Sequence, residues 1–204
     1  MTGSTMSASE AFAVFVKFFF IFTPFFVTAV FIALTENEDN QVRHALAIRV
    51  TAGIVVISLI LFFLGQSLFE VLGITVDAFR IGAGALLFLS AVSLVEGKLQ
   101  LPNVKRSIMD LAVVPLAIPI TLGPGSVGAL IVMGTETVGT DRLVTAAAIT
   151  AAGLAVGALL YLSAEVKRLL GRSGISMLSK LTGLILAALS CQMMFTGIAA
   201  FLKP

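Results

Sequence analysis

The segment from Leu111 to Met133 constrains the fold most, because it is long and apolar enough to cross a membrane yet contains helix-breaking residues. It has no charged residue, and it holds Pro115, Pro119 and the triplet Gly123-Pro124-Gly125. Each proline lacks a backbone donor and leaves the carbonyl four residues earlier without its helical partner. In a bilayer such groups are tolerated only when buried in protein or facing a wet cavity. We therefore predict a discontinuous helix, a feature typical of binding sites in secondary transporters.

The composition places the whole chain in a membrane. Its 204 residues are 58% hydrophobic and 12% charged, against about 25% charged in soluble domains. No basic stretch resembles a nucleic-acid-binding arm, so no nucleic-acid partner is expected. A single cysteine excludes an intrachain disulfide. We expect an all-α polytopic protein with one transmembrane domain over residues 1–204.

Six segments are long enough to span a bilayer, which takes roughly 20 apolar residues. They are Phe12–Leu34, Val50–Phe69, Phe79–Val95, Leu111–Met133, Leu143–Ala164 and Leu181–Leu202.

The basic residues between these spans predict the orientation. Nine lie on one side of the expected membrane: Arg43, Arg49, Lys98, Lys105, Arg106, Lys167, Arg168, Arg172 and Lys180. The other side holds four, namely Lys17, Arg80, Arg142 and Lys203. Because basic residues accumulate in cytoplasmic loops, we expect both termini on the non-cytoplasmic side of the inner membrane.

The two halves of the chain share features at similar spacing, which predicts an internal duplication. Pro24 lies in the first expected span and the proline cluster in the fourth. The other matches are Gly73-Ile74-Thr75 with Gly174-Ile175-Ser176, Arg80 with Lys180, and Gly97 with Gly197. Three spans per half force the halves into opposite orientations, with a site where they meet. We expect two inverted three-helix repeats, over about residues 11–97 and 108–202, with discontinuous helices 1 and 4.

Several blocks of the sequence resemble the MarC/SnatA family of bacterial and archaeal membrane proteins. PLAIPITLGPG at Pro115–Gly125, preceded by Asp110, is similar to the family's hallmark. Gly73–Val92 resembles its second conserved region, and Thr182–Met193 its last helix. The resemblance implies a six-span inner-membrane protein. Some members are described as transporters of small neutral amino acids such as glycine and alanine, and the family is distantly similar to amino-acid exporters of the LysE type.

The first span departs from the family pattern. The family's Asn-Pro-x-Gly stands here as Thr23-Pro24-Phe25-Phe26. Thr23 keeps a hydroxyl but lacks the amide, and Phe26 fills space that a glycine leaves open. We therefore expect a smaller or more apolar pocket than in a typical member.

The break in the fourth span suggests how a substrate is held. If the helix restarts after Pro124 with Gly125 or Ser126 as its cap, the free N–H groups near residues 127–129 carry the positive end of a helix dipole. A carboxylate is a natural ligand there, and freed carbonyls could take an ammonium group or a cation. The expected substrate-binding residues are Thr23, Pro24, Pro115, Pro119, Gly123, Pro124, Gly125, Ser126 and Gln192.

Each of these residues also has a purely structural reading. Prolines can simply kink a helix, and polar residues such as Thr23 and Gln192 can bond within or between helices. Asp110 and Arg80 are candidates for ion coupling or gating. A helix-end role for Asp110 and a local pair between Arg80 and Asp77 are the favoured alternatives.

Enzyme chemistry finds little support. His44 and Cys191 are the only residues of their types, expected in the first loop and deep in the sixth span. No metal-ligand spacing or phosphate-binding glycine loop occurs. We expect no enzyme, no cofactor and no metal, with Na+ or H+ as the coupling ion. The expected partners are a small amino-acid substrate and the lipid bilayer, and a homo-oligomer is left open.

Secondary transport of a small neutral amino acid is therefore the favoured function. An exporter of amino acids or toxic small molecules is the first alternative, and a non-transporting membrane accessory protein is the second.

Overall fold

The computed structural model describes residues 6–97 and 121–202, and the described chain is helical with no strand. The helices are α1 (Ala8–Ile21), α2 (Pro24–Leu34), α3 (Asn40–Leu72), α4 (Val76–Glu96), α5 (Pro124–Glu136), α6 (Asp141–Tyr161) and α7 (Ser163–Leu202).

Four helices of the described chain are long and apolar enough to cross a membrane. They lie at Asn40–Gly65, Val76–Glu96, Asp141–Tyr161 and Ser173–Leu202. The pair α1 and α2, bent by 41° at the break between them, makes a fifth if counted as one span. The first part of the expected fourth span, up to residue 120, lies outside the described residues, as do Asp110, Pro115 and Pro119.

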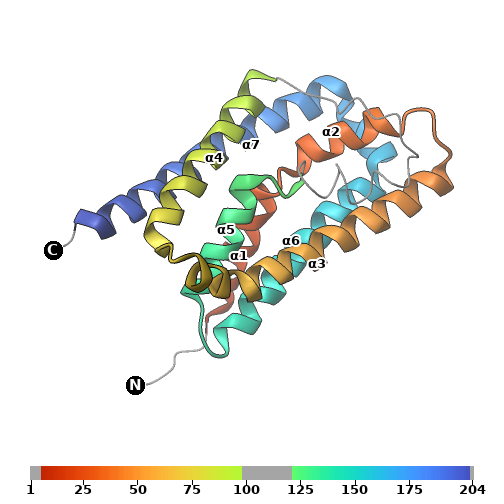
Figure 1. The fold of residues 1–204 in the computed structure, drawn as a ribbon. Helices are drawn as coiled ribbons and strands as arrows, with labels where there is room; N and C mark the ends of the chain where they lie inside the picture. The colour runs from red at the N-terminus through yellow and green to blue at the C-terminus, as the bar shows by residue number, and fades with distance from the viewer. Residues whose placement is uncertain (1–5, 98–120, 203–204) are drawn as a thin grey trace.

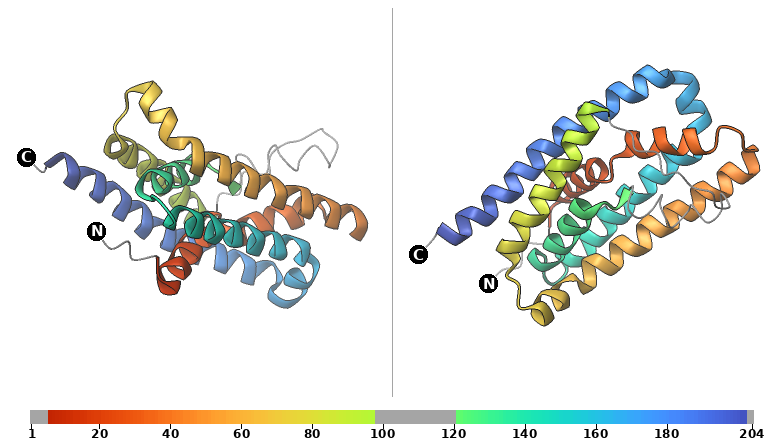
Figure 2. Two further views of the ribbon diagram at one scale, coloured as in Figure 1. Left: turned by 90° about the horizontal axis from the view of Figure 1, so that it is seen from below. Right: turned by 45° about the horizontal axis from the view of Figure 1, so that its top comes forward.

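Two pairs of long helices enclose the broken ones. Helix α4 packs along α7, and α3 packs along α6 (Figure 1). Helix α5 contacts both α3 and α4, while α1 contacts α6 and α2 contacts α7. Figure 2 shows the same arrangement from two other sides. The short helices that flank the breaks therefore lie in the middle of the bundle.

The described chain begins and ends at the same end of the bundle. The N-terminal end of α1 is held there by Met6, whose N–H donates to the Asp141 carboxylate at 2.8 Å. Gly197 of α7 packs against the backbone of Asp77, at the start of α4, so α7 ends at this end too. We call this end the terminal face (lower left in Figure 1). The opposite end, where α2 joins α3 and α6 joins α7, is the loop face.

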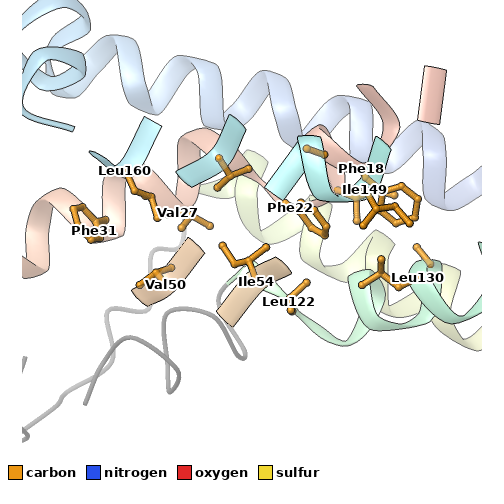
Figure 3. Packing of buried hydrophobic residues seen from close by; sticks show 14 of the residues in the cluster. Phe18, Phe22, Val27, Phe31, Val50, Ile54, Leu122, Leu130, Ile149 and Leu160 are labelled. Atoms are coloured by element: carbon orange, nitrogen blue, oxygen red, sulfur yellow. The ribbon is translucent and has the colours of Figure 1, made fainter. Parts of the chain in front are cut away.

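The main apolar cluster joins α1, α2, α3, α5 and α6. Its large aromatic members are fully buried. Apolar residues nevertheless occur on all sides of each helix, so the sequence of a single helix does not mark one buried side. Figure 3 shows this packing around Phe18, Phe22, Val27, Phe31, Val50, Ile54, Leu122, Leu130, Ile149 and Leu160. Many large apolar side chains on the outside of α3, α4 and α7 remain exposed. An apolar exterior of this extent is typical of a surface covered by lipid.

Two expected loops are wrong, because the helices extend beyond their apolar parts. Arg43, His44 and Arg49 lie within α3, which begins at Asn40. Lys167 and Arg168 lie within α7, whose first part runs to a backbone break at Gly171, with φ 63° and ψ 176°. Hydropathy marks only the part of a helix that faces lipid, so it does not distinguish polar helical turns outside that part from loops.

Close helix contacts depend on particular glycines, which yields a stability prediction. A Cβ on Gly134 of α5 would lie 2.0 Å from the carbonyl oxygen of Phe62 in α3. Backbone cannot move aside cheaply, so Gly134→Ala should lower stability by about 1–3 kcal/mol. Gly82→Ala is the matched control, because nothing lies within 4 Å of its Cβ position in α4, and it should gain up to about 1 kcal/mol. Thermal unfolding in detergent measures both, and equal midpoints would contradict this packing.

Candidate functional site

The break between α1 and α2 holds a threonine in a strained conformation. Thr23 has φ 50° and ψ 54°, in the left-handed region, and it is followed by Pro24 as the first residue of α2. A β-branched residue rarely adopts this conformation, and such strain clusters at functional sites. Thr23 is 8% exposed, and its hydroxyl has no hydrogen-bond partner. Half of the other buried threonine and serine hydroxyls of the described chain bond to a carbonyl of their own helix, as Thr28 does to Pro24 at 2.7 Å. Ser58 and Ser163 are also buried without a partner, but neither lies at a helix break with its backbone in the left-handed region.

The second break follows the same plan at the start of α5. Gly123 is the N-cap and Pro124 the first helical residue, a position where proline is favoured. Val127 donates the first intrahelical bond, to the Gly123 carbonyl at 3.0 Å. The expected cap at Gly125 or Ser126, and the expected free N–H groups near residues 127–129, are therefore wrong. The helix starts two residues earlier because proline needs no N–H partner, so the free donors are those of Gly125 and Ser126.

A hydrogen bond joins the two breaks across the middle of the bundle. The Ser126 hydroxyl, at the start of α5, donates to the carbonyl of Ile21, the last residue of α1, at 3.1 Å. Ser126 is 5% exposed and Ile21 is 1% exposed. The bond satisfies a carbonyl that the end of α1 leaves without a helical donor.

A cavity of about 240 Å³ lies where the breaks meet, and four of the expected binding residues line it: Thr23, Gly123, Pro124 and Ser126. The other described lining residues are Ile21, Phe26, Leu87, Ser90, Ser93, Leu94, Thr121 and Leu186. We call it the central cavity. Its described lining is apolar or bears hydroxyls, and it includes no charged side chain.

Two helix N-termini supply the electrostatic character of the central cavity. In α2 the first intrahelical bond is from Val27 to the Thr23 carbonyl at 3.0 Å, so the Phe25 and Phe26 N–H groups lack intrahelical acceptors, as those of Gly125 and Ser126 do in α5. Each terminus carries roughly half a positive charge. Together they match one anionic group. Among the described residues no cluster of three metal-ligating side chains occurs.

Further cavities adjoin the central cavity on both sides. Toward the loop face lies a cavity of about 430 Å³ that shares Phe26, Ser93 and Leu94 with it. Toward the terminal face lies one of about 210 Å³ that shares Ile21 and Leu87. We call these the loop-face cavity and the terminal-face cavity. The three cavities therefore form a series, in which each outer cavity shares lining residues with the central one.

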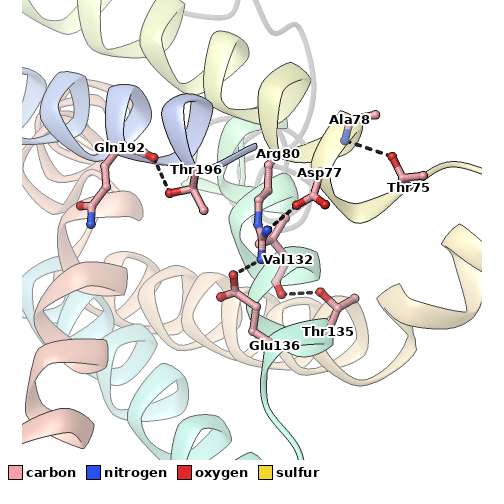
Figure 4. Close-up of polar contacts among 9 residues, drawn as sticks. All are labelled: Thr75, Asp77, Ala78, Arg80, Val132, Thr135, Glu136, Gln192 and Thr196. Atoms are coloured by element: carbon pink, nitrogen blue, oxygen red, sulfur yellow. Dashed lines mark hydrogen bonds and ion pairs between the residues drawn. The ribbon is translucent and has the colours of Figure 1, made fainter. Parts of the chain in front are cut away.

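Arg80 and Gln192 line the terminal-face cavity rather than the central one. Arg80 binds the carboxylate of Asp77 at 2.5 Å, which confirms the expected local pair, and also that of Glu136 at the end of α5 (Figure 4). The main-chain carbonyl of Gln192 accepts a hydrogen bond from the Thr196 hydroxyl at 2.8 Å, within α7. These two residues are thus placed apart from the helix breaks.

The remaining expected residues divide into two groups. Pro24 and Gly125 lie at the breaks and are buried, but they do not line the central cavity. A Cβ on Gly125 would lie 2.5 Å from the Leu87 Cα, so this glycine permits α5 to approach α4. Asp110, Pro115 and Pro119 lie outside the described residues.

Sequence reasoning missed Thr121 as a lining residue and Glu136 as the partner of Arg80. Thr121 adjoins the Gly-Pro-Gly triplet, and its hydroxyl could have been noted. Glu136 lies 100 residues after Glu36, so a closer comparison of the halves could have found it.

Comparisons with known proteins agree over the whole helical chain. A family model described as MarC family integral membrane protein matches residues 8–202. A UPF0056 membrane protein of Methanocaldococcus jannaschii is 33% identical, over 90% of this chain and 93% of the relative. One from Aquifex aeolicus is 32% identical, over 90% and 89%. YhcE of Escherichia coli, also a UPF0056 membrane protein, is 30% identical, over 92% and 91%. No solved structure matches the chain.

The bond between the two breaks yields a second stability prediction. Ser126→Ala removes the only described donor to the buried Ile21 carbonyl, so it should cost about 1–3 kcal/mol. Ser90→Ala is the control, because the Ser90 hydroxyl also lines the central cavity but bonds the Leu86 carbonyl of its own helix, at 3.0 Å. Its midpoint of thermal unfolding in detergent should change little. A similar loss in both variants would mean that the bond does not hold the breaks together.

Proposed function

Because the chain belongs to the MarC family of integral membrane proteins, we propose that it is a secondary transporter of small neutral amino acids such as glycine and alanine. The observation that carries the proposal is the central cavity, where two helix N-termini and the unpartnered Thr23 hydroxyl meet. Discontinuous helices with this geometry recur at transporter binding sites. The family relatives named above bear only a membrane-protein name, so the substrate rests on the chemistry of the cavity.

The helix termini suit the carboxylate of an amino acid. Two half-charges at the starts of α2 and α5 balance one carboxylate without a basic side chain. The Thr23 hydroxyl can donate to the same group. Main-chain carbonyls at the end of α1 can accept from the ammonium group, since helix C-termini carry the opposite partial charge.

The size and lining of the central cavity favour a small uncharged side chain. Its volume of about 240 Å³ is below the range of roughly 300–1,000 Å³ typical of drug-sized ligands. Phe26, Leu87 and Leu186 are apolar, and the described lining includes no group that would compensate a charged side chain. Burial of such a charge would be costly.

The arrangement of the helices supports an inverted repeat of two three-helix units. Helices α3 and α6 pack together, as do α4 and α7, and in the proposed repeat the members of each pair are equivalent. Helices α2 and α5 both begin at a break with proline as the first helical residue. The breaks then lie in spans 1 and 4, at the interface of the repeats, where a transported substrate is held.

The distribution of basic residues supports the orientation. The described loop-face residues include Arg43, Arg49, Lys167, Arg168 and Lys180, and those nearer the terminal face are Lys17, Arg80 and Arg142. The positive-inside rule then places the loop face in the cytoplasm of a bacterium or archaeon and both termini outside the inner membrane. Na+ or H+ is the coupling ion of the proposal, and no further cofactor or enzymatic step is part of it.

Uptake by purified protein in proteoliposomes tests this function. Labelled glycine and alanine should enter under an imposed Na+ or proton gradient. Thr23→Val keeps the shape of the side chain but removes the hydroxyl. Since that hydroxyl has no protein partner, the thermal midpoint should not fall, whereas the KM should rise about tenfold or more through loss of a bond to a charged group. Thr28→Val is the matched control, because the Thr28 hydroxyl bonds within its own helix.

Three outcomes would redirect the proposal. An equal KM in both valine variants would remove Thr23 from the site. Release of amino acids from loaded vesicles without uptake would favour the exporter. Folded protein that moves no amino acid in either direction but co-purifies with another membrane protein would favour the accessory function.

A further inference from the structure

Helices α2 and α5 can be aligned at an offset of 100 residues, with matches at both ends. Pro24 and Pro124 are their first residues, and Glu36 and Glu136 stand near their ends, each preceded by a threonine. The helices run in opposite directions through the bundle, so Glu36 lies at the loop face and Glu136 at the terminal face. The duplication therefore places one carboxylate at each end of the series of cavities.

The terminal face is closed by an ion pair that uses one of these carboxylates. Glu136 binds Arg80 of α4 beside the terminal-face cavity (Figure 4). The Arg80 side chain is 16% exposed and that of Glu136 is 40% exposed. This contact ties the end of α5 to the start of α4, on the outer side of Ile21 and Leu87.

The residue equivalent to Arg80 at the loop face is Lys180, again 100 residues later. Its Cε lies 3.9 Å from the Cβ position of Gly97, and Gly97 lines the loop-face cavity. Glu36 lines the same cavity but pairs with Lys167, in the first part of α7, at 3.1 Å. The ion pair that the duplication predicts is thus not formed at the loop face, where the cavity is about twice as large as its counterpart.

We propose that Arg80–Glu136 and Glu36–Lys180 are alternating gates of one transport path, with the terminal-face gate closed and the loop-face gate open in this structure. In the opposite state Glu36 leaves Lys167 and pairs with Lys180, while Glu136 separates from Arg80. The proposal rests on the proposed transport function. Partly exposed ion pairs contribute modestly to stability, which suits contacts that form and break in each cycle.

The two lysines therefore compete for Glu36 and favour opposite states. Lys167→Met removes a competitor of Lys180 for Glu36, so it should shift the population toward the state open at the terminal face. Lys180→Met prevents the Glu36–Lys180 pair from forming, so the loop-face gate cannot close. It should shift the population toward the state open at the loop face. A general loss of folding would change accessibility in the same direction in both variants.

Cysteine labelling in membrane vesicles measures this shift. In a Cys191→Ser background, Thr196→Cys reports the terminal-face cavity and Ser176→Cys the loop-face cavity, since these residues line them. We expect Lys167→Met to raise the rate of maleimide labelling at position 196 and lower it at 176, and Lys180→Met to do the reverse, each about two- to fivefold. In the exchange variant Glu36→Lys/Lys180→Glu, labelling at position 196 should recover relative to Lys180→Glu alone.

Three results would overturn the gates. The labelling rates could change in the same direction in the two methionine variants, they could stay unchanged, or labelling at position 196 could fail to recover in the exchange variant. Because labelling needs no substrate, it is independent of uptake. If the labelling rates shift in opposite directions in the two variants but no amino acid is transported, the gates are upheld and the proposed substrate is refuted. Uptake with unchanged labelling would refute the gates and leave the transport function in place.

Discussion

The structure depends on one constraint, which is that two helices are interrupted in the middle of an apolar bundle. The hydrogen bond from Ser126 to the Ile21 carbonyl joins the two interruptions. Each interruption exposes main-chain groups that lipid cannot satisfy. The chain resolves this by bringing the breaks together, so that the end of α1 meets the start of α5. The Thr23 hydroxyl remains without a partner, and the cavity beside it is the place where a ligand could complete the arrangement.

The long helices serve to enclose these breaks. Inside a membrane, apolar side chains gain little by leaving lipid for protein, so helix contacts depend on close packing. Gly125 and Gly134 allow α5 to approach the backbones of α4 and α3, and Gly84 and Gly183 do the same between α4 and α7. The resulting frame keeps the middle of the bundle shielded from lipid while leaving room at the breaks.

Charge is excluded from the middle and concentrated at the two faces. The described lining of the central cavity is neutral, whereas each adjoining cavity has a lysine or arginine and a glutamate in its lining. A neutral centre between two charged ends is consistent with the proposed amino-acid substrate, whose own charges would be balanced by helix dipoles. The two faces nevertheless differ in their ion pairs, because Glu136 pairs with Arg80 of α4 while Glu36 pairs with Lys167 in the first part of α7.

The sequence alone determined that the chain is helical and membrane-embedded, and that Pro24 and Pro124 interrupt helices, because apolar content and proline act over a few neighbouring residues. It also predicted the pair of Arg80 with Asp77, one helical turn apart. Only the tertiary structure decided that Gly123 caps α5, that Gly125 serves packing, and that Gln192 lies in the terminal-face cavity. The central cavity is lined from α1, α2, α4, α5 and α7, so its shape depends on how distant segments pack, and no local pattern in the chain encodes that.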